Sequence, residues 1–400
     1  MRILIGLTYY RPHYSGLTIY TERLAKALVR RGHDVTVLTS RFSKSLPAYE
    51  VTDGVKIYRV NVIMRISKGV IMPAMPFQAF QLIRKADIVN YHVPQLDAAP
   101  GTILSRLLGK PVILTYHCDL QLPKGFIHQA ANVVSHLANH VSAKSASLII
   151  TNTGDYAVHS QFLRHYLAKV GVINPPAELP YVSSDQVMSF KQKWGIKPHQ
   201  KVIGMAARLA AEKGVEFLVE AMPEVLKKYP DAKVLFLGQY ENVLGEEAYA
   251  QRLLPLIGEL GDHWSFLGNV SAEDLAAFYR SCHVTVLPST NATESFGIVQ
   301  VESMICGVPV VATDIPGVRH PVHASGMGII IPPKDGRSLA DAILQILDHP
   351  DLYRGDSELI RQHYGSDHVA EQYEKQMLEL LGEVMLEGNP PELQEELPGE

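Results

Sequence analysis

The sequence predicts an α/β protein with two doubly wound parallel-sheet domains, and three observations lead to this prediction. The chain has 400 residues, more than one hydrophobic core usually serves, so two domains are expected. Short apolar runs alternate with longer amphipathic segments, which is the pattern of parallel sheets covered by helices. The segment VINPPAELPY at 172–181 interrupts this pattern with prolines that stiffen the chain, as a linker does. We therefore expect a first domain over 1–175 and a second over 177–366.

The first domain is predicted from five short apolar runs and one clear amphipathic helix. The buried strands are expected at 2–7, 34–39, 87–91, 111–115 and 147–151. A helix is expected over 17–31, because Leu24 and Leu28 form an apolar stripe while Arg23 and Lys26 face water.

The same pattern restarts after the linker and predicts the second domain. Its strands are expected at 201–205, 233–237, 283–287, 308–311 and 328–331, with a helix over 215–229. A further amphipathic helix is expected over 367–386. The last residues, 387–400, are acidic and rich in proline, so they are predicted to be disordered.

Composition excludes several classes of function. A net charge of −4 lacks the basic surplus of a nucleic-acid-binding protein, so no nucleic-acid partner is expected. No stretch approaches the roughly 20 apolar residues that span a bilayer. The three cysteines, Cys118, Cys282 and Cys306, fit no disulfide or metal framework, which indicates reduced thiols in a cytoplasmic protein. No strand is followed by Gly-x-Gly-x-x-Gly, which argues against a dehydrogenase.

Two cations follow the first strand of the second domain. Arg208 and Lys213 lie in the loop between the strand at 201–205 and the helix at 215–229. Ligands of open α/β sheets bind at this edge, and a guanidinium with an ammonium suits a diphosphate. Surface salt bridges would explain the same pair equally well.

A second constellation follows the strand at 283–287. Glu294 lies where a helix is expected to begin, and Glu302 lies about two turns further on. Backbone N–H groups from 295 to 299 form an anion site at the helix start, and Gly297 permits close approach. The helix dipole alone would favour a glutamate at position 294, near the helix start. It does not account for Glu302 within the apolar run VQVESM, because a buried carboxylate is costly without a partner.

Four segments together resemble the retaining glycosyltransferases of family 4, which have the GT-B fold. They are RILIGLTYYRPHYSGLTIYTERLAKALVRRGHDVTVLT near the start, LTYHCD at 114–119, ARLAAEKG at 207–214 and ESFGIVQVE at 294–302. The resemblance covers nearly the whole chain. It implies two Rossmann-like domains facing a cleft, with the C-terminal helix returning to the first domain. The family often has Gly-Gly in its first loop, where this chain has Ser15-Gly16.

The resemblance also implies which residues act. Arg208 and Lys213 would hold the diphosphate, Glu294 the donor hexose and Glu302 the ribose hydroxyls, while His117 would stand beside the anomeric carbon. Further donor contacts are implied for Gly16, Leu267, Val270, Phe296, Gly297, Ile298 and Val299. The donor would be a UDP- or GDP-sugar on the second domain. The acceptor, a saccharide or lipid-linked hydroxyl, would lie on the first.

The implied chemistry is transfer of a hexose without metal or other cofactor, since Arg208 and Lys213 would neutralise the leaving diphosphate. Two alternatives stay open: a nucleotide-sugar epimerase with the same fold, and a catalytically silent module that binds nucleotide sugars. The residues 62–85 fit either a membrane- or acceptor-facing surface or an internal helix with basic ends. His13, His33 and His92 are interpreted as structural or surface groups. The oligomeric state is left open.

Overall fold

The computed structural model describes residues 1–66, 69–95, 97–119 and 126–382. The chain divides into two compact units: unit 1 comprises Met1–Pro176 and Gly365–Glu400, and unit 2 comprises Ala177–Tyr364. The division falls within the proline-rich segment 172–181. The predicted disordered tail, 387–400, lies outside the described residues.

Unit 1 is built on one sheet with the strand order β10-β9-β8-β7-β1-β2-β4-β3, parallel except for the β3–β4 pair at one edge. Its strands are β1 (Arg2–Gly6), β2 (Asp34–Arg41), β3 (Tyr49–Thr52), β4 (Val55–Asn61), β7 (Ile88–Val93), β8 (Val112–Tyr116), β9 (Leu148–Thr151) and β10 (Val170–Val172). The central strands β7, β8 and β9 are buried along their whole length, which explains why their sequences are largely continuous apolar runs.

Helices cover both faces of this sheet. They are α1 (Gly16–Arg30), α2 (Met75–Ile83), α3 (Ala98–Leu107), α4 (Phe126–Ser145), α5 (Gly154–His159) and α14 (Ser366–Leu381). Apolar residues of α1 and α14 share one core with β1 and β2, and those of α2 and α3 share another with β7 and β8. Helix α1 begins where the Ser15 hydroxyl accepts the backbone N–H of Thr18 at 3.2 Å.

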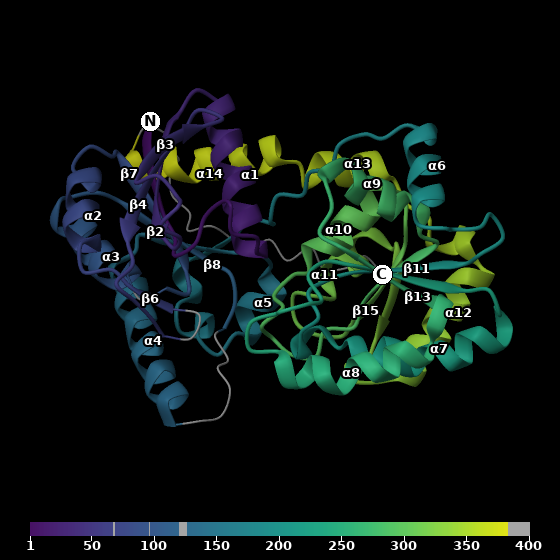
Figure 1. Cartoon of the computed structure of the whole chain (residues 1–400). Helices are drawn as coiled ribbons and strands as arrows, with labels where there is room; N and C mark the ends of the chain where they lie inside the picture. Colours follow the sequence, from purple (N-terminus) through teal and green to yellow (C-terminus); the bar gives the residue numbers. More distant parts are fainter. Residues whose placement is uncertain (67–68, 96, 120–125, 383–400) are drawn as a thin grey trace. The chain divides into compact units, whose positions relative to one another are not determined.

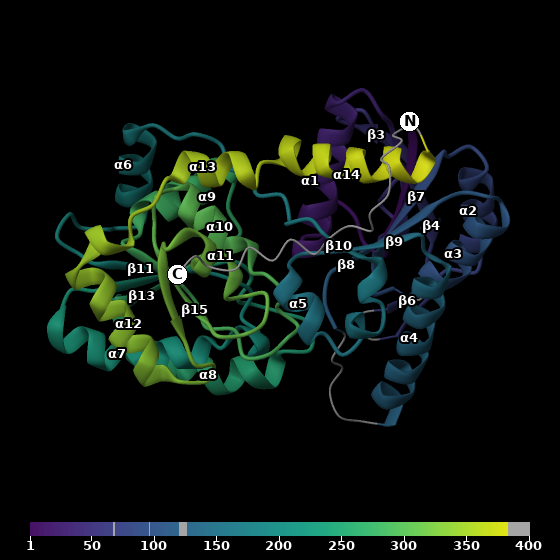
Figure 2. The same ribbon diagram turned by 180° about the vertical axis from the view of Figure 1, so that it is seen from behind.

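The last described helix, α14, lies alongside α1 (Figures 1 and 2). Arg30 and Arg31 of the α1 C-terminus form ion pairs with Asp367 and Glu374. Residues 383–386 of the predicted helix lie outside the described residues. The helix stops at Leu381 because Gly382 adopts the left-handed conformation with φ 73°.

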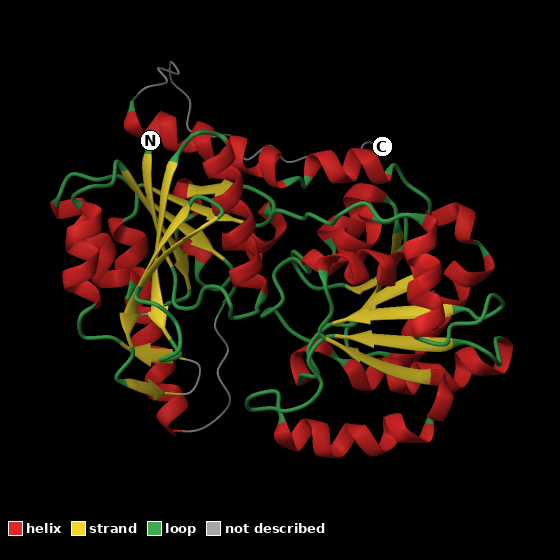
Figure 3. Cartoon of the chain, turned by 45° about the horizontal axis from the view of Figure 1, so that its top comes forward, coloured by secondary structure: helices red, strands yellow, loops and turns green. Residues whose placement is uncertain are grey.

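Unit 2 has a sheet of parallel strands in the order β13-β12-β11-β14-β15-β16. Figure 3 shows the strands of this sheet running in the same direction. The strands are β11 (Val202–Ala206), β12 (Lys233–Leu237), β13 (Trp264–Gly268), β14 (Val284–Leu287), β15 (Val310–Thr313) and β16 (Gly328–Ile331). The chain starts in the middle at β11, fills one side and then crosses to β14. The topological switch point therefore lies between β11 and β14, where ligands of such sheets bind.

Helices also cover both faces of the unit 2 sheet. They are α6 (Ser184–Lys193), α7 (Val215–Lys228), α8 (Glu247–Glu259), α9 (Ala272–Ser281), α10 (Ile298–Ile305), α11 (His320–Ser325), α12 (Gly336–Asp348) and α13 (Ser357–His363). One core joins α7, α8 and α12 to the sheet, and separate clusters join α6, α9 and α10 to its other face (Figure 1).

One prediction for the segment 62–85 was a single internal helix, and the structure differs from it. A hairpin of β5 (Met64–Ile66) and β6 (Gly69–Ile71) comes first, and only Met75–Ile83 is helical. Across the described residues, no helix is both long and apolar enough to cross a membrane. All three cysteines are free thiols.

Candidate functional site

The switch point of unit 2 brings together the two predicted constellations. Strands β11 and β14 are neighbours, paired in parallel at Ile203 with Val284 and Gly204 with Thr285. Each strand ends in a loop that carries predicted residues, 207–214 after β11 and 288–297 after β14. Both loops leave the same edge of the sheet, since the strands run in the same direction.

Gly214 fixes the first loop against the second. A short 3₁₀ turn, Ala211–Lys213, ends at Gly214, whose φ of 65° lies in the left-handed region. A Cβ at this position would come within 2.1 Å of the Pro288 carbonyl oxygen, so only glycine permits this approach. The Thr290 backbone N–H donates to the Glu212 carbonyl at 3.0 Å and ties the loops together.

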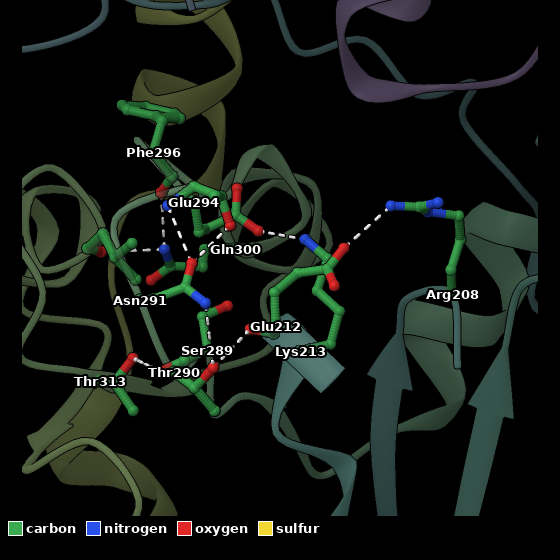
Figure 4. Close-up of polar contacts among 12 residues, drawn as sticks. Arg208, Glu212, Lys213, Ser289, Thr290, Asn291, Glu294, Phe296, Gln300 and Thr313 are labelled. Carbon is green, nitrogen blue, oxygen red and sulfur yellow. Dashed lines mark hydrogen bonds and ion pairs between the residues drawn. The ribbon is translucent and has the colours of Figure 1, made fainter. Parts of the chain in front are cut away.

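The two predicted cations lie in this loop pair, each beside a carboxylate (Figure 4). Lys213 Nζ donates to Glu294 Oε2, which joins residues 81 apart in the chain. Arg208 Nη2 donates to Glu212 Oε1 at 3.0 Å. The Arg208 side chain is 41% exposed and that of Lys213 is 20% exposed, so both remain within reach of a ligand.

Helix α10 begins at the end of the second loop, 288–297. Gly297, with φ 75°, precedes it, and no side chain among the described residues caps its first turn. A Cβ on Gly297 would lie 2.2 Å from Leu287 Cδ2, so the close packing also requires glycine. The Phe296 side chain is buried, and Ile298 and Val299 are partly buried in the first turn. Backbone N–H groups at a helix start without a side-chain cap are a common place for an anion to bind.

Glu302, the second predicted glutamate, is 5% exposed. Its Oε2 accepts a hydrogen bond from the Tyr279 hydroxyl of α9 at 3.1 Å. Burial and then the Glu302 carboxylate raise the pKa of Tyr279 well above its usual value, so the phenol stays protonated and donates. Leu267 and Val270 pack in the same apolar cluster as Tyr279.

Three polar residues of the second loop, Ser289, Thr290 and Asn291, are not among the predicted site residues. Ser289 is buried, and its hydroxyl has no partner among the described residues. The Asn291 side-chain oxygen accepts hydrogen bonds from the Thr293 backbone N–H at 3.0 Å and from the Thr293 hydroxyl at 2.5 Å. The signal was the polar run Ser-Thr-Asn directly after a buried strand, at the edge where ligands bind.

The other two predicted residues, His117 and Gly16, belong to unit 1. His117 follows β8, and its backbone N–H donates to the Val93 carbonyl at 3.0 Å. Burial lowers the pKa of His117 to about 3, so its imidazole is neutral at pH 7. Gly16 is the first residue of α1, and a Cβ there would meet no atom within 4 Å.

Comparison with known proteins gives matches over both units. Residues 15–172 match the family model described as Glycosyl transferase 4-like domain, and residues 187–362 match Glycosyl transferases group 1. The chain is 27% identical over 361 residues to an uncharacterized glycosyltransferase of Methanocaldococcus jannaschii, covering 87% of this chain and 89% of that relative. It is 28% identical over 359 residues to the D-inositol 3-phosphate glycosyltransferase of Corynebacterium diphtheriae, covering 83% of this chain and 82% of the relative.

Two solved structures have a similar fold. The Anabaena protein HepE in complex with UDP-glucose has a TM-score of 0.74 and 21% identity, covering 96% of this chain and 100% of that chain. Sucrose-phosphate synthase from Thermosynechococcus elongatus has the same TM-score of 0.74 and 21% identity, covering 96% and 100%.

Proposed function

Since this chain belongs to the glycosyltransferases of group 1 and has their GT-B fold, we propose that it moves a hexose from a nucleoside-diphosphate sugar to a hydroxyl acceptor with retention of configuration. Unit 2 binds the donor. Unit 1 binds the acceptor and supplies His117.

One observation carries the proposal: two cations and an uncapped helix start converge at the switch point of unit 2. Arg208 and Lys213 come from one loop, and the first turn of α10 comes from the other. A diphosphate is the common ligand that matches two positive side chains and a helix N-terminus together. The buried Glu302 carboxylate, further along α10, suits the ribose hydroxyls of the same ligand.

The chemical role of these groups follows from the charge that develops. When the anomeric C–O bond breaks, negative charge grows on the diphosphate, and preorganised cations and N–H groups lower the barrier. The acceptor oxygen bonds to the anomeric carbon on the face that the diphosphate leaves, and a nucleoside diphosphate and a proton are released. Proton NMR coupling at the anomeric centre of the product tests retention.

Because Arg208 and Lys213 supply the positive charge, we expect the reaction to need neither a divalent metal nor another cofactor. Thermal-shift measurements with UDP- and GDP-sugars, run with and without excess EDTA, test the donor class and whether donor binding needs a metal. A ligand present at about 100 times its Kd stabilises by about 2.7 kcal/mol, which raises Tm by several degrees. Unchanged Tm with every sugar nucleotide would contradict donor binding, and a rise that EDTA abolishes would contradict metal independence.

The acceptor is proposed to be a lipid-linked saccharide, a glycolipid or a polysaccharide precursor. The surface of unit 1 supports this. Phe77 and Phe80 of α2 are 66% and 37% exposed, and Ile63 beside β5 is 70% exposed. The exposed Arg84 and Lys85 follow directly after α2. Exposed aromatic rings with adjacent basic side chains favour contact with an anionic bilayer.

Vesicle flotation tests this contact. With vesicles containing anionic phospholipid, the protein is expected to float, and Phe77→Ser with Phe80→Ser is expected to reduce the floating fraction several-fold. Leu352→Ser is the matched control, since Leu352 is 72% exposed in unit 2 and should not affect flotation. Wild-type protein that stays at the bottom of the gradient would remove the membrane proposal and leave the donor proposal intact.

A further inference from the structure

Buried polar side chains form a continuous hydrogen-bonded chain through unit 1, from Tyr373 of α14 to the candidate residue His117. The Tyr20 and Tyr373 hydroxyls are 2.8 Å apart. The Tyr373 hydroxyl lies 3.0 Å from Thr115 Oγ1, which donates to Asn90 Oδ1 at 2.9 Å. These residues are each at most 2% exposed, so water does not interrupt the chain.

The chain continues from Asn90 through His92 to His117. Asn90 Nδ2 lies 3.4 Å from His92 Nε2, and His92 Nδ1 lies 2.9 Å from His117 Nε2. The two imidazole rings are stacked, with centroids 5.1 Å apart. The Tyr20 ring packs edge-on against both. His117 is therefore held by a packed, hydrogen-bonded surrounding.

The hydroxyl of Thr21 decides which nitrogen of His92 carries the proton. Thr21 has one hydroxyl proton, and it donates that proton to the Leu17 carbonyl at 2.9 Å. Its oxygen also lies 3.0 Å from His92 Nδ1, so this nitrogen must be the donor. His92 Nε2 is then unprotonated and accepts a hydrogen bond from Asn90 Nδ2. This agrees with the Thr115–Asn90 bond, because Asn90 Oδ1 accepts from Thr115 and its Nδ2 therefore faces His92.

We propose that Asn90 and His92 are positioning residues that hold His117 in the tautomer protonated at Nδ1. The proton on His92 Nδ1 is shared with His117 Nε2, which must accept it and so carries no proton itself. Every proton in the chain then points the same way, from Tyr20 toward His117.

The tautomer determines which group of His117 a substrate meets. Its role in catalysis therefore rests on the proposed function. The side-chain hydrogen bond of His117 to the described residues is made by Nε2 and not by Nδ1, so the Nδ1–H is available to a sugar oxygen. Burial lowers the pKa of both histidines, and both rings stay neutral. His117 then acts as a hydrogen-bond donor of fixed direction, and the proposal gives His92, interpreted from the sequence as a structural or surface group, the role of orienting it.

Nitrogen-15 NMR of histidine-labelled protein tests the tautomer without any activity measurement. Protonated and unprotonated ring nitrogens have widely separated shifts, and His117→Gln identifies the His117 signals among the 17 histidines. We expect a protonated Nδ1 and an unprotonated Nε2. A His117 protonated at Nε2 in the wild-type protein would overturn the inference.

Two substitutions at His92 separate the hydrogen bond from packing. His92→Asn keeps an N–H donor at the δ position and is expected to preserve the His117 tautomer and most of the rate. His92→Leu removes the donor, so both tautomers of His117 should appear and kcat should fall at least about tenfold, with the donor KM unchanged. If His92→Asn and His92→Leu have the same populations of the two His117 tautomers and the same kcat, the inference is overturned.

A second route avoids any folding defect at His92. Thr115→Val frees the Asn90 amide to turn over and is expected to mix the tautomers of His117. Ser142→Ala is the matched control, since this buried hydroxyl of α4 donates only to the Ala138 carbonyl, at 2.8 Å, and lies outside the chain. An unmixed His117 spectrum in a folded Thr115→Val protein counts against the inference. If His117→Gln leaves transfer intact, the role of His117 in the proposed function fails, whatever the NMR result.

Discussion

Lys213→Met and Arg208→Met are each expected to lower the kcat of hexose transfer by about a hundredfold, and more when combined. Each substitution removes a positive charge from the switch point of unit 2 at similar side-chain volume. Loss of one preorganised group of this kind typically costs about 3 kcal/mol of transition-state stabilisation. Initial rates at saturating donor, with UDP or GDP release as the readout, measure the effect.

Two controls separate this effect from a loss of structure. Lys213→Met leaves the Glu294 carboxylate without its ammonium partner, whereas Lys213→Arg keeps a positive charge beside it and should retain much more of the rate. Lys227→Met, on the exposed face of α7, removes an equal charge from an exposed pair with Glu224 and should leave kcat unchanged. Normal turnover in folded Arg208→Met and Lys213→Met proteins would contradict the proposed diphosphate site.

Glu302→Gln is expected to weaken donor binding by between about tenfold and a hundredfold. A buried carboxylate that accepts sugar hydroxyls contributes hydrogen bonds of about 1.5–3 kcal/mol, more than an amide does. Because the ribose does not react, kcat at saturating donor should change much less than KM. Isothermal titration with UDP and GDP measures the binding loss directly.

Tyr279→Phe is the companion variant for this prediction. It removes the hydroxyl that donates to Glu302 but keeps the carboxylate, so its effect on donor affinity should be smaller than that of Glu302→Gln. If Glu302→Gln lowers kcat while the affinity for the nucleotide is unchanged, Glu302 acts on the reacting sugar and its assignment to the ribose is wrong.

Most of the fold could be predicted because its central strands are buried on both faces. The observed bounds of β12 and β16 are the predicted ones, and the other predicted strands are shifted by one or two residues. Strand β13 was missed because it lies at the edge of its sheet, where Ser265 and Phe266 are only half-buried. The hairpin β5–β6 was missed because an antiparallel pair outside the main sheets has no continuous apolar run.

The candidate site was predictable only as two separate loops. Sequence indicates that Arg208 and Lys213 follow one strand and that Glu294 follows another. It does not indicate that Lys213 contacts Glu294, because that contact depends on β11 and β14 being neighbours. The partner of His117 was likewise hidden, since His92 lies on a different strand and looks like an ordinary buried residue.

The order in which the chain is made has a consequence for α14. Unit 2 occupies one uninterrupted stretch, whereas unit 1 needs residues from both ends of the chain. Synthesis proceeds from the N-terminus, so every residue of unit 2 leaves the ribosome before α14 exists. Until then Tyr20 lacks the hydroxyl of Tyr373, and the core beneath α1 lacks Val369 and Met377. The half of the protein that is translated first is therefore the last to be completed, and a fragment ending at residue 176 lacks part of its own core.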